Sequence, residues 1–342
     1  RRKRQYRITA AAEYVGSSTA IRLWYCGAAG TQNPEEDETT CRTLTTEDLI
    51  SEELLLPQPE ETQQTALIPE SVEATAGTAL SNFRPAVQQV QIDRTQLADY
   101  ETLVRNFYAI DANTMAGSDQ LSVEKLLGMD MTLPQEGDGP QILIYHTHSQ
   151  EAFADSVPGD VNTGIVGVGE CLTKILTEQY GYRVLHNTGQ YDVETRDNAY
   201  SRALPAVEQI LAENPSIQVI IDLHRDEVAE ETKLVTDIQG RPTARFMFFN
   251  GLSRTRKTGD IDYLANENQE ANLAFSFQMQ LKAAEYYPGL TRRIYLKGYR
   301  YNMHLRPRTL LVELGAQNNT VEEAINACDP LAHILDMVLK GE

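Results

Sequence analysis

The chain has 342 residues, of which 41% are hydrophobic, so it can hold one large folded domain with additional segments. Its formal net charge of −19 argues against a nucleic-acid partner, because binding to phosphates requires a basic face. The four cysteines contain no Cys-x-x-Cys pair, which argues against a zinc ribbon and against a disulfide framework.

The first 30 residues combine a basic cluster, RRKRQYR, with a mildly apolar stretch over residues 8–29. Glu13 and Arg22 interrupt that stretch. A charge at the centre of a membrane span costs roughly 2.5–3.5 kcal/mol, and a span needs about 20 mainly apolar residues. The residues by themselves therefore favour a soluble or interfacial segment over a membrane span.

Residues 31–92 are rich in acidic residues, proline, threonine and glutamine, including the run EEDE at 35–38. Such a composition buries too little apolar surface to offset the entropy of ordering. It predicts a disordered, self-repelling acidic linker.

Order is expected to return at Asp93. Apolar residues recur at three- and four-residue spacing from Leu97 to Ile110, which predicts one helix, and a short second helix is expected over Leu121–Leu127. Together they make a small helical region over residues 93–138, which ends in a segment rich in glycine and proline.

From residue 139 to 342, apolar runs alternate with helical patterns, which predicts an α/β domain with a mostly parallel sheet flanked by helices. A β-hairpin with its turn at Gly240 is expected to join Lys233–Ile238 to Ala244–Phe249, and an amphipathic helix is expected over Ala265–Tyr286. The other expected strands are Ile142–Tyr145, Tyr182–Leu185, Ile217–Leu223 and Thr309–Leu314, and the other expected helices are Ile165–Tyr180, Asn198–Glu213 and Val321–Leu339.

Side chains that bind metals or carry protons follow three of these strands. The carboxyl ends of strands in an open α/β sheet are where ligands bind. Two histidines and a carboxylate with an open fourth position form the catalytic type of zinc site, and a further glutamate can take a proton from water there. Singly, each residue also fits a structural role, such as a hydrogen-bonded histidine or a salt-bridged carboxylate. The candidates are His146, His148 and Glu151 after the first strand, Glu170 early in the following helix, Asp222, His224, Arg225 and Asp226 on the Ile217 strand, and Glu313 on the last.

At ILIYHTHSQEAF the sequence resembles the stage II sporulation protein P family of spore-forming bacteria. Further ordered motifs carry the same resemblance from about Asp93 to the C-terminus: LVRNFYAID, KLLGMDM, IIDLHRDE, ARFMFFNG and LLVELGAQNNTVEEA. The family is related to zinc-dependent N-acetylmuramoyl-L-alanine amidases.

The resemblance implies a zinc enzyme that cleaves peptidoglycan during forespore engulfment, as an amidase and also as an endopeptidase. It implies His148, Glu170 and His224 as zinc ligands, with Glu151 competing with Glu170, and Glu313 as the catalytic glutamate. His146, Arg225 and Asn302 resemble positions around the family's cleft.

The resemblance also implies the stage II sporulation proteins D and M as partners, and a location outside the membrane at the forespore septum. The family's membrane anchor would fall at residues 8–29, where this chain is unusually polar. The loop YNMHL at 301–305 also departs from the family pattern. The alternatives are a non-catalytic wall-binding scaffold with the same fold and a zinc carboxypeptidase-like peptidase.

Overall fold

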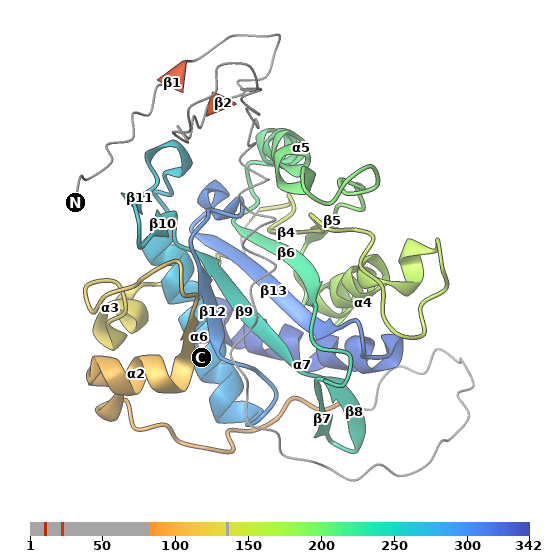
Figure 1. Cartoon of the computed structure of the whole chain (residues 1–342). Coiled ribbons are helices and arrows are strands. Elements are labelled where there is room, and N and C mark those ends of the chain that lie inside the picture. Colours follow the sequence, from red (N-terminus) through yellow and green to blue (C-terminus); the bar gives the residue numbers. More distant parts are fainter. Residues whose placement is uncertain (1–9, 12–21, 24–82, 135–136) are drawn as a thin grey trace, which may run out of the picture. The chain divides into compact units, whose positions relative to one another are not determined.

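The computed structural model describes residues 10–11, 22–23, 83–134 and 137–342 (Figure 1). Contacts divide the chain into two units, residues 1–77 and 78–342. In the first unit, strand β1 (Ala10–Ala11) pairs antiparallel with β2 (Arg22–Leu23). The rest of the predicted N-terminal segment, and the predicted acidic linker up to residue 82, lie outside the described residues.

A seven-stranded sheet forms the centre of the second unit, in the order β3-β12-β9-β13-β6-β4-β5. All neighbouring pairs are parallel except β9 with β13, which confirms the predicted mostly parallel α/β fold. The strands are β3 (Tyr108–Ile110), β4 (Ile142–Tyr145), β5 (Val184–His186), β6 (Val219–Asp226), β9 (Phe246–Gly251), β12 (Ile294–Lys297) and β13 (Arg308–Ala316).

Helices cover both faces of this sheet (Figure 1). The largest cluster of buried apolar residues joins one face to α4 (Ile165–Glu178), α6 (Gln269–Tyr286) and α7 (Val321–Lys340). A smaller cluster joins the other face of β4 and β6 to α5 (Ala199–Glu213). Successive side chains along a strand point to opposite faces of the sheet, so β4 and β6 contribute residues to both clusters.

The predicted hairpin is corrected in its second strand. β7 (Val235–Ile238) turns at Gly240 and pairs with β8 (Arg241–Ala244). The run that follows, predicted as the hairpin partner, instead forms β9 in the centre of the sheet. Its residues are buried along its whole length, so burial between two strands of the main sheet outweighs local pairing.

The helix predicted over Leu97–Ile110 is shorter in the structure. A 3-10 turn (Gln96–Ala98) precedes α2 (Tyr100–Phe107), which Asp99 caps by accepting a hydrogen bond from the Thr102 N–H. The chain then becomes extended as β3 and pairs with β12. The pairing with a distant strand therefore overrides the helical pattern at its C-terminal end.

The end of the predicted linker belongs to the folded unit. The Phe83 ring stacks on Tyr287, with centroids 6.3 Å apart, and the Gln89 N–H donates to the Glu285 carbonyl oxygen at 2.8 Å.

Helix α3 (Val123–Gly128) packs on α6, where the Gln278 side chain donates to the Leu126 and Met129 carbonyl oxygens. Because α6 contacts helices and sheet, it is buried on most sides rather than amphipathic as predicted.

The remaining described elements are short. They are the hairpin of β10 (Arg254–Thr255) and β11 (Gly259–Asp260), and the 3-10 turns Val161–Thr163, Asp262–Leu264 and Met303–Leu305.

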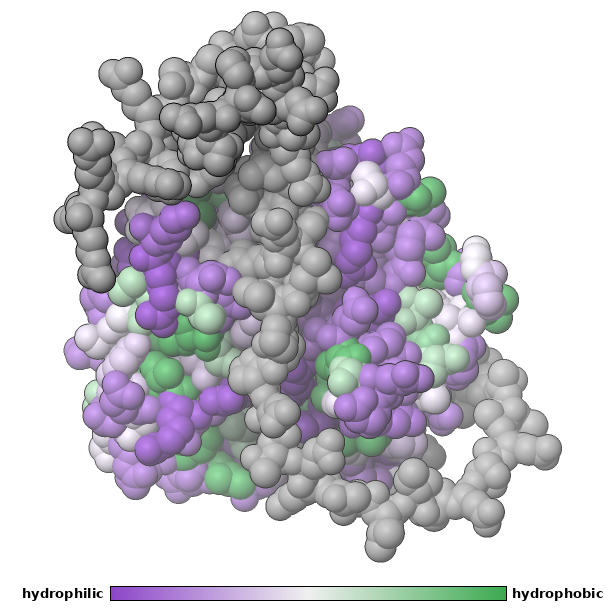
Figure 2. Space-filling view, in the orientation of Figure 1, coloured by the Kyte–Doolittle hydropathy of each residue, from purple (hydrophilic) through white to green (hydrophobic). Residues whose placement is uncertain are grey.

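The described surface on the face drawn in Figure 2 is mainly hydrophilic, with hydrophobic residues in small separate patches. Large exposed apolar side chains such as Val87, Met115, Val193 and Tyr263 come from distant parts of the chain. Within the described ranges, none of the helices combines the length and apolar character that a membrane crossing requires.

Candidate metal centre

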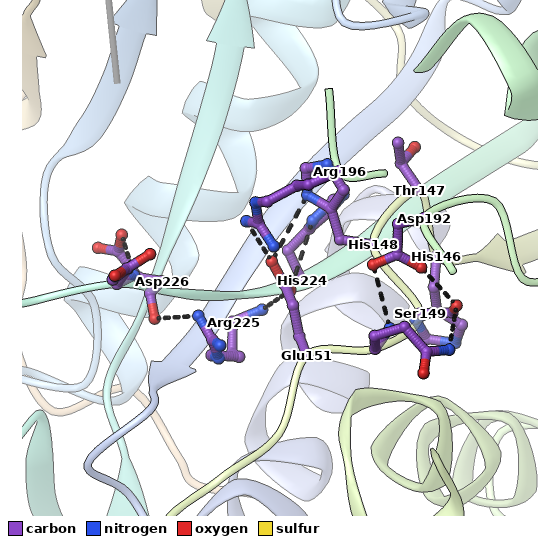
Figure 3. Close-up of polar contacts among 12 residues, drawn as sticks. His146, Thr147, His148, Ser149, Glu151, Asp192, Arg196, His224, Arg225 and Asp226 are labelled. Carbon is purple, nitrogen blue, oxygen red and sulfur yellow. Dashed lines mark hydrogen bonds and ion pairs between the residues drawn. The ribbon is translucent and has the colours of Figure 1, made fainter. Parts of the chain in front are cut away.

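Two histidines and one glutamate converge at the carboxyl end of β4 and β6 (Figure 3). His148 follows β4, and the chain then turns so that the Glu151 N–H donates to the His148 carbonyl oxygen at 3.4 Å. The Glu151 carboxylate lies between the two rings: its Oε1 is 3.5 Å from His148 Nδ1, and its Oε2 is 3.5 Å from His224 Nδ1. All three side chains are at most 10% exposed.

Asp222 connects the two histidine-bearing segments. Its Oδ1 lies 2.8 Å from His224 Nε2, on the side of the ring away from Glu151. The same carboxylate accepts hydrogen bonds from the Thr147 N–H at 2.9 Å and the Thr147 hydroxyl at 2.7 Å. A carboxylate behind a histidine ligand orients the ring and raises its basicity, which is the usual arrangement behind a protein-bound metal.

This donor set fits a zinc ion. Two ligands bound at about 2.0–2.1 Å to one tetrahedral zinc ion lie roughly 3.4 Å apart, and each histidine Nδ1 lies 3.5 Å from one of the two oxygens of Glu151. Two imidazoles and one carboxylate are also the ligand types of catalytic zinc sites, which keep a fourth position for water or substrate.

The charges of the three groups depend on one another. Burial favours the neutral form of each and would raise the pKa of Glu151, but the charges and hydrogen bonds of His224 and His148 together outweigh it and hold the pKa of that carboxyl well below its usual value. Burial would lower the pKa of His224, but Asp222 and Glu151 outweigh it and raise the pKa well above the usual value. Without a metal, the cluster therefore pairs an imidazolium with carboxylates, and a bound cation would replace that proton.

Glu313 lies beside this cluster, opposite His224 in the register of β13 and β6. Its Oε2 atom is buried and has no hydrogen-bond partner among the described residues. Burial, followed by the charge of Asp226, raises the pKa of Glu313 to about 8. A carboxylate oxygen that is buried without a partner is costly for the fold, which is a sign of a functional position.

The structure does not bring Glu170 to the two histidines. Glu170 is the sixth residue of α4, its side chain is 73% exposed, and its Oε2 lies 3.1 Å from His186 Nδ1. The competing residue Glu151 occupies the place between His148 and His224. In this structure Glu151, and not Glu170, lies with the two histidines, because the turn after His148 returns Glu151 to the sheet edge. Which of the two glutamates binds a metal stays a prediction.

Glu170 belongs instead to a hydrogen-bonded chain with His186 and His146. His186 Nε2 lies 2.9 Å from His146 Nε2, and His146 Nδ1 lies 2.8 Å from the Leu223 carbonyl oxygen. Since a carbonyl oxygen can only accept a hydrogen bond, His146 donates from Nδ1, and its Nε2 accepts a hydrogen bond that His186 donates from Nε2. The chain attaches His146 to the strand that carries His224.

Gly169 provides the space for these two rings, and we expect Gly169→Ala to destabilise the fold by about 1–3 kcal/mol. A Cβ atom there would lie 2.6 Å from His146 Nε2 and 2.7 Å from His186 Nε2. Urea unfolding measures the change. Gly128→Ala is the matched control, because that helical glycine has open space around it, and an equal loss in both variants would contradict the explanation.

Arg225 and Asn302 hold backbone segments around the cluster. The backbone N–H of Arg225 donates to Glu151 Oε2 at 2.8 Å, and the side-chain Nε of Arg225 donates to the Ala152 carbonyl oxygen at 3.0 Å. The Asn302 amide donates to the Tyr200 carbonyl oxygen at 3.1 Å. Tyr301 and Asn302 both have positive φ, at 49° and 54°, which is unusual for residues other than glycine.

Two residues at the site have no signal in the sequence pattern. Tyr200 sits at the start of α5, and its ring lies edge-on to His148 with centroids 5.6 Å apart. Arg196 precedes α5, and its Nη2 lies 2.8 Å from Glu151 Oε1 (Figure 3). Both come from the segment YDVETRDNAY, in which neither periodicity nor a motif marks them.

The chain is similar to several proteins of known structure and to a curated relative. It is 26% identical over 217 residues to stage II sporulation protein P of Bacillus subtilis (strain 168), covering 58% of this chain and 51% of that protein. The chain thus spans about half the length of this curated relative.

Two solved structures illustrate the similarity in structure. The N-acetylmuramoyl-L-alanine amidase AmiC2 of Nostoc punctiforme is 14% identical, with a TM-score of 0.35, over 59% of this chain and 97% of that chain. The CwlD amidase of Clostridioides difficile, solved in complex with the GerS lipoprotein, is 13% identical, with a TM-score of 0.34, over 59% and 95%.

The family comparison covers the larger part of the chain. The model of the family described as Stage II sporulation protein P (SpoIIP) matches residues 50–336, which include the cluster of His148, Glu151 and His224. The match agrees with the motifs of the sequence, from LVRNFYAID to LLVELGAQNN. The chain therefore belongs to the stage II sporulation protein P family.

Proposed function

We propose that this protein is a zinc-dependent peptidoglycan hydrolase of sporulation that cleaves the amide between the muramic acid lactyl group and L-alanine. The observation that carries the proposal is the convergence of His148, Glu151 and His224 beside Glu313. Membership of the sporulation protein family supports the choice of cell wall as substrate, with endopeptidase activity as a further reaction.

The residues divide the chemistry between them. His148, Glu151 and His224 would hold the ion, which when bound supplies Lewis-acid polarisation of the amide carbonyl and of water. Glu313 accepts the proton of the attacking water and returns it to the leaving amine. Asp222 keeps the His224 ring oriented, with Nδ1 facing Glu151.

The proposed setting follows from the same family. The protein would act outside the membrane at the forespore septum, with the stage II sporulation proteins D and M as partners. The acidic residues before the folded part, 31–82, would let the catalytic domain reach the wall from a membrane tether.

The test measures zinc content and product in parallel. Purified wild type and His224→Ala are analysed for zinc per chain, and both are incubated with peptidoglycan sacculi whose products are identified by mass spectrometry. We expect one zinc per wild-type chain, loss of zinc in His224→Ala, and stem peptides released from intact glycan strands.

The other outcomes separate the alternatives. Zinc with cleavage of cross-links alone would assign an endopeptidase, and cleavage of free stem peptides alone would assign a carboxypeptidase-like peptidase. A wild type with neither zinc nor cleavage would overturn the proposal and leave a wall-binding scaffold.

A further inference from the structure

Arg196 places a guanidinium group directly on a proposed zinc ligand. Its Nη2 lies 2.8 Å from Glu151 Oε1, the same oxygen that lies 3.5 Å from His148 Nδ1. The Glu151 side chain is 1% exposed, whereas that of Arg196 is 46% exposed. The arginine therefore reaches the buried cluster from the solvent side, along the direction from which a substrate would enter.

Arg196 is not required to hold Glu151 in place. The other carboxylate oxygen, Oε2, already accepts a hydrogen bond from the backbone N–H of Arg225 at 2.8 Å. Asp192 anchors the same loop by accepting hydrogen bonds from the Ser149 hydroxyl at 2.8 Å and the Gln150 N–H at 3.2 Å. The backbone of the loop thus remains fixed without the arginine.

The charge of Arg196 acts on the proposed catalytic glutamate as well. Burial would lower the pKa of Arg196, but the charge and the hydrogen bond of Glu151 together raise that pKa by more. The charge of Glu313 raises the pKa of Arg196 further. The guanidinium therefore lies within electrostatic reach of both a metal ligand and the proposed base. The reacting carbonyl group must occupy the same region, since it has to meet the metal and the water that Glu313 activates.

We propose that Arg196 is a catalytic residue with two successive partners: Glu151 when no metal is bound, and the carbonyl oxygen of the scissile amide during hydrolysis. This inference rests on the proposed function. Before metal binding, the guanidinium is a second positive charge on Glu151, beside that of His224. With a divalent cation held by Glu151, the guanidinium would lose this partner, and its N–H groups would be available to the substrate.

The role in the reaction follows from the movement of charge. The water oxygen forms a bond to the carbonyl carbon, its proton passes to Glu313, and the π electron pair of the carbonyl moves onto its oxygen. Arg196 donates hydrogen bonds to that oxygen as it becomes negative. When the electron pair returns, the carbon–nitrogen bond breaks, and the leaving nitrogen takes the proton from Glu313.

The test compares Arg196→Gln with Arg196→Lys. Zinc affinity is measured by competition with a chelator, and kcat and KM are measured on a soluble muramyl-peptide. We expect Arg196→Gln to bind zinc about tenfold more tightly, because a competing cation is gone. Its kcat should fall by roughly 10²–10³-fold with little change in KM. Arg196→Lys keeps the charge, so its zinc affinity should stay near the wild-type value.

Arg202→Gln is the matched control, because Arg202 makes an ion pair of similar length, 2.7 Å to Glu194, away from the cluster. It should match wild type in both measurements, and melting temperatures of all variants report on folding. Unchanged or weaker zinc binding in Arg196→Gln, an unchanged kcat, or a rise in KM alone would each overturn the inference. A wild type without zinc would instead overturn the proposed function.

Discussion

Glu313→Gln should reduce peptidoglycan hydrolysis by about 10³-fold or more while leaving one zinc per chain. General-base catalysis contributes typically 10²–10⁴-fold, and glutamine has the size of glutamate but cannot accept the proton. The side chain lies next to the ligands without being one of the three grouped donors, so zinc content should not change. Sacculus digestion and metal analysis on the same preparation check both parts.

The same variant carries its own folding control. In the metal-free protein the pKa of Glu313 is raised to about 8, above its usual value of 4.5. Wild type therefore loses stability as the pH rises between these values, because the unfolded state ionises first. The glutamine variant has no such loss, so its melting temperature relative to wild type, measured with chelator present, should increase from pH 5 to pH 8. Full hydrolytic activity in this variant would contradict the role of Glu313 as the general base.

Glu151→Gln should weaken zinc binding by at least about a hundredfold, whereas Glu170→Gln should bind zinc as wild type does. Glu151 lies between the two histidines, and its replacement removes the one carboxylate of the ligand set. Glu170 is exposed and contacts His186. Chelator competition on the two variants, which carry the same chemical change, decides between the two glutamates.

The reverse result is equally informative. Zinc lost in Glu170→Gln and kept in Glu151→Gln would show that α4 supplies the ligand and that the turn after His148 rearranges on metal binding. Loss in both variants would show that the chain from Glu170 through His186 to His146 supports the site. Thermal unfolding of each variant separates these cases from misfolding.

The sequence by itself determined the strands and helices that meet at the site. The apolar run Ile142–Tyr145 forms β4 with the predicted bounds, and the pattern from Ile165 forms α4. Both patterns are local, because the spacing of apolar residues, and the polar residues that end each run, depend only on neighbours along the chain. His148, His224 and Glu313 lie toward the same edge of the sheet because β4, β6 and β13 run parallel, so their carboxyl ends point the same way.

Only the tertiary structure decided which carboxylate joins the histidines. Glu151 and Glu170 are both near the first strand in sequence, but the turn after His148 brings one inward, and the face of α4 leaves the other in solvent. Arg196 reaches the cluster from a loop without periodicity. The pairing of β3 with β12 likewise overrides a helical pattern. These features depend on contacts between residues far apart in the chain, and local propensity carries no information about such contacts.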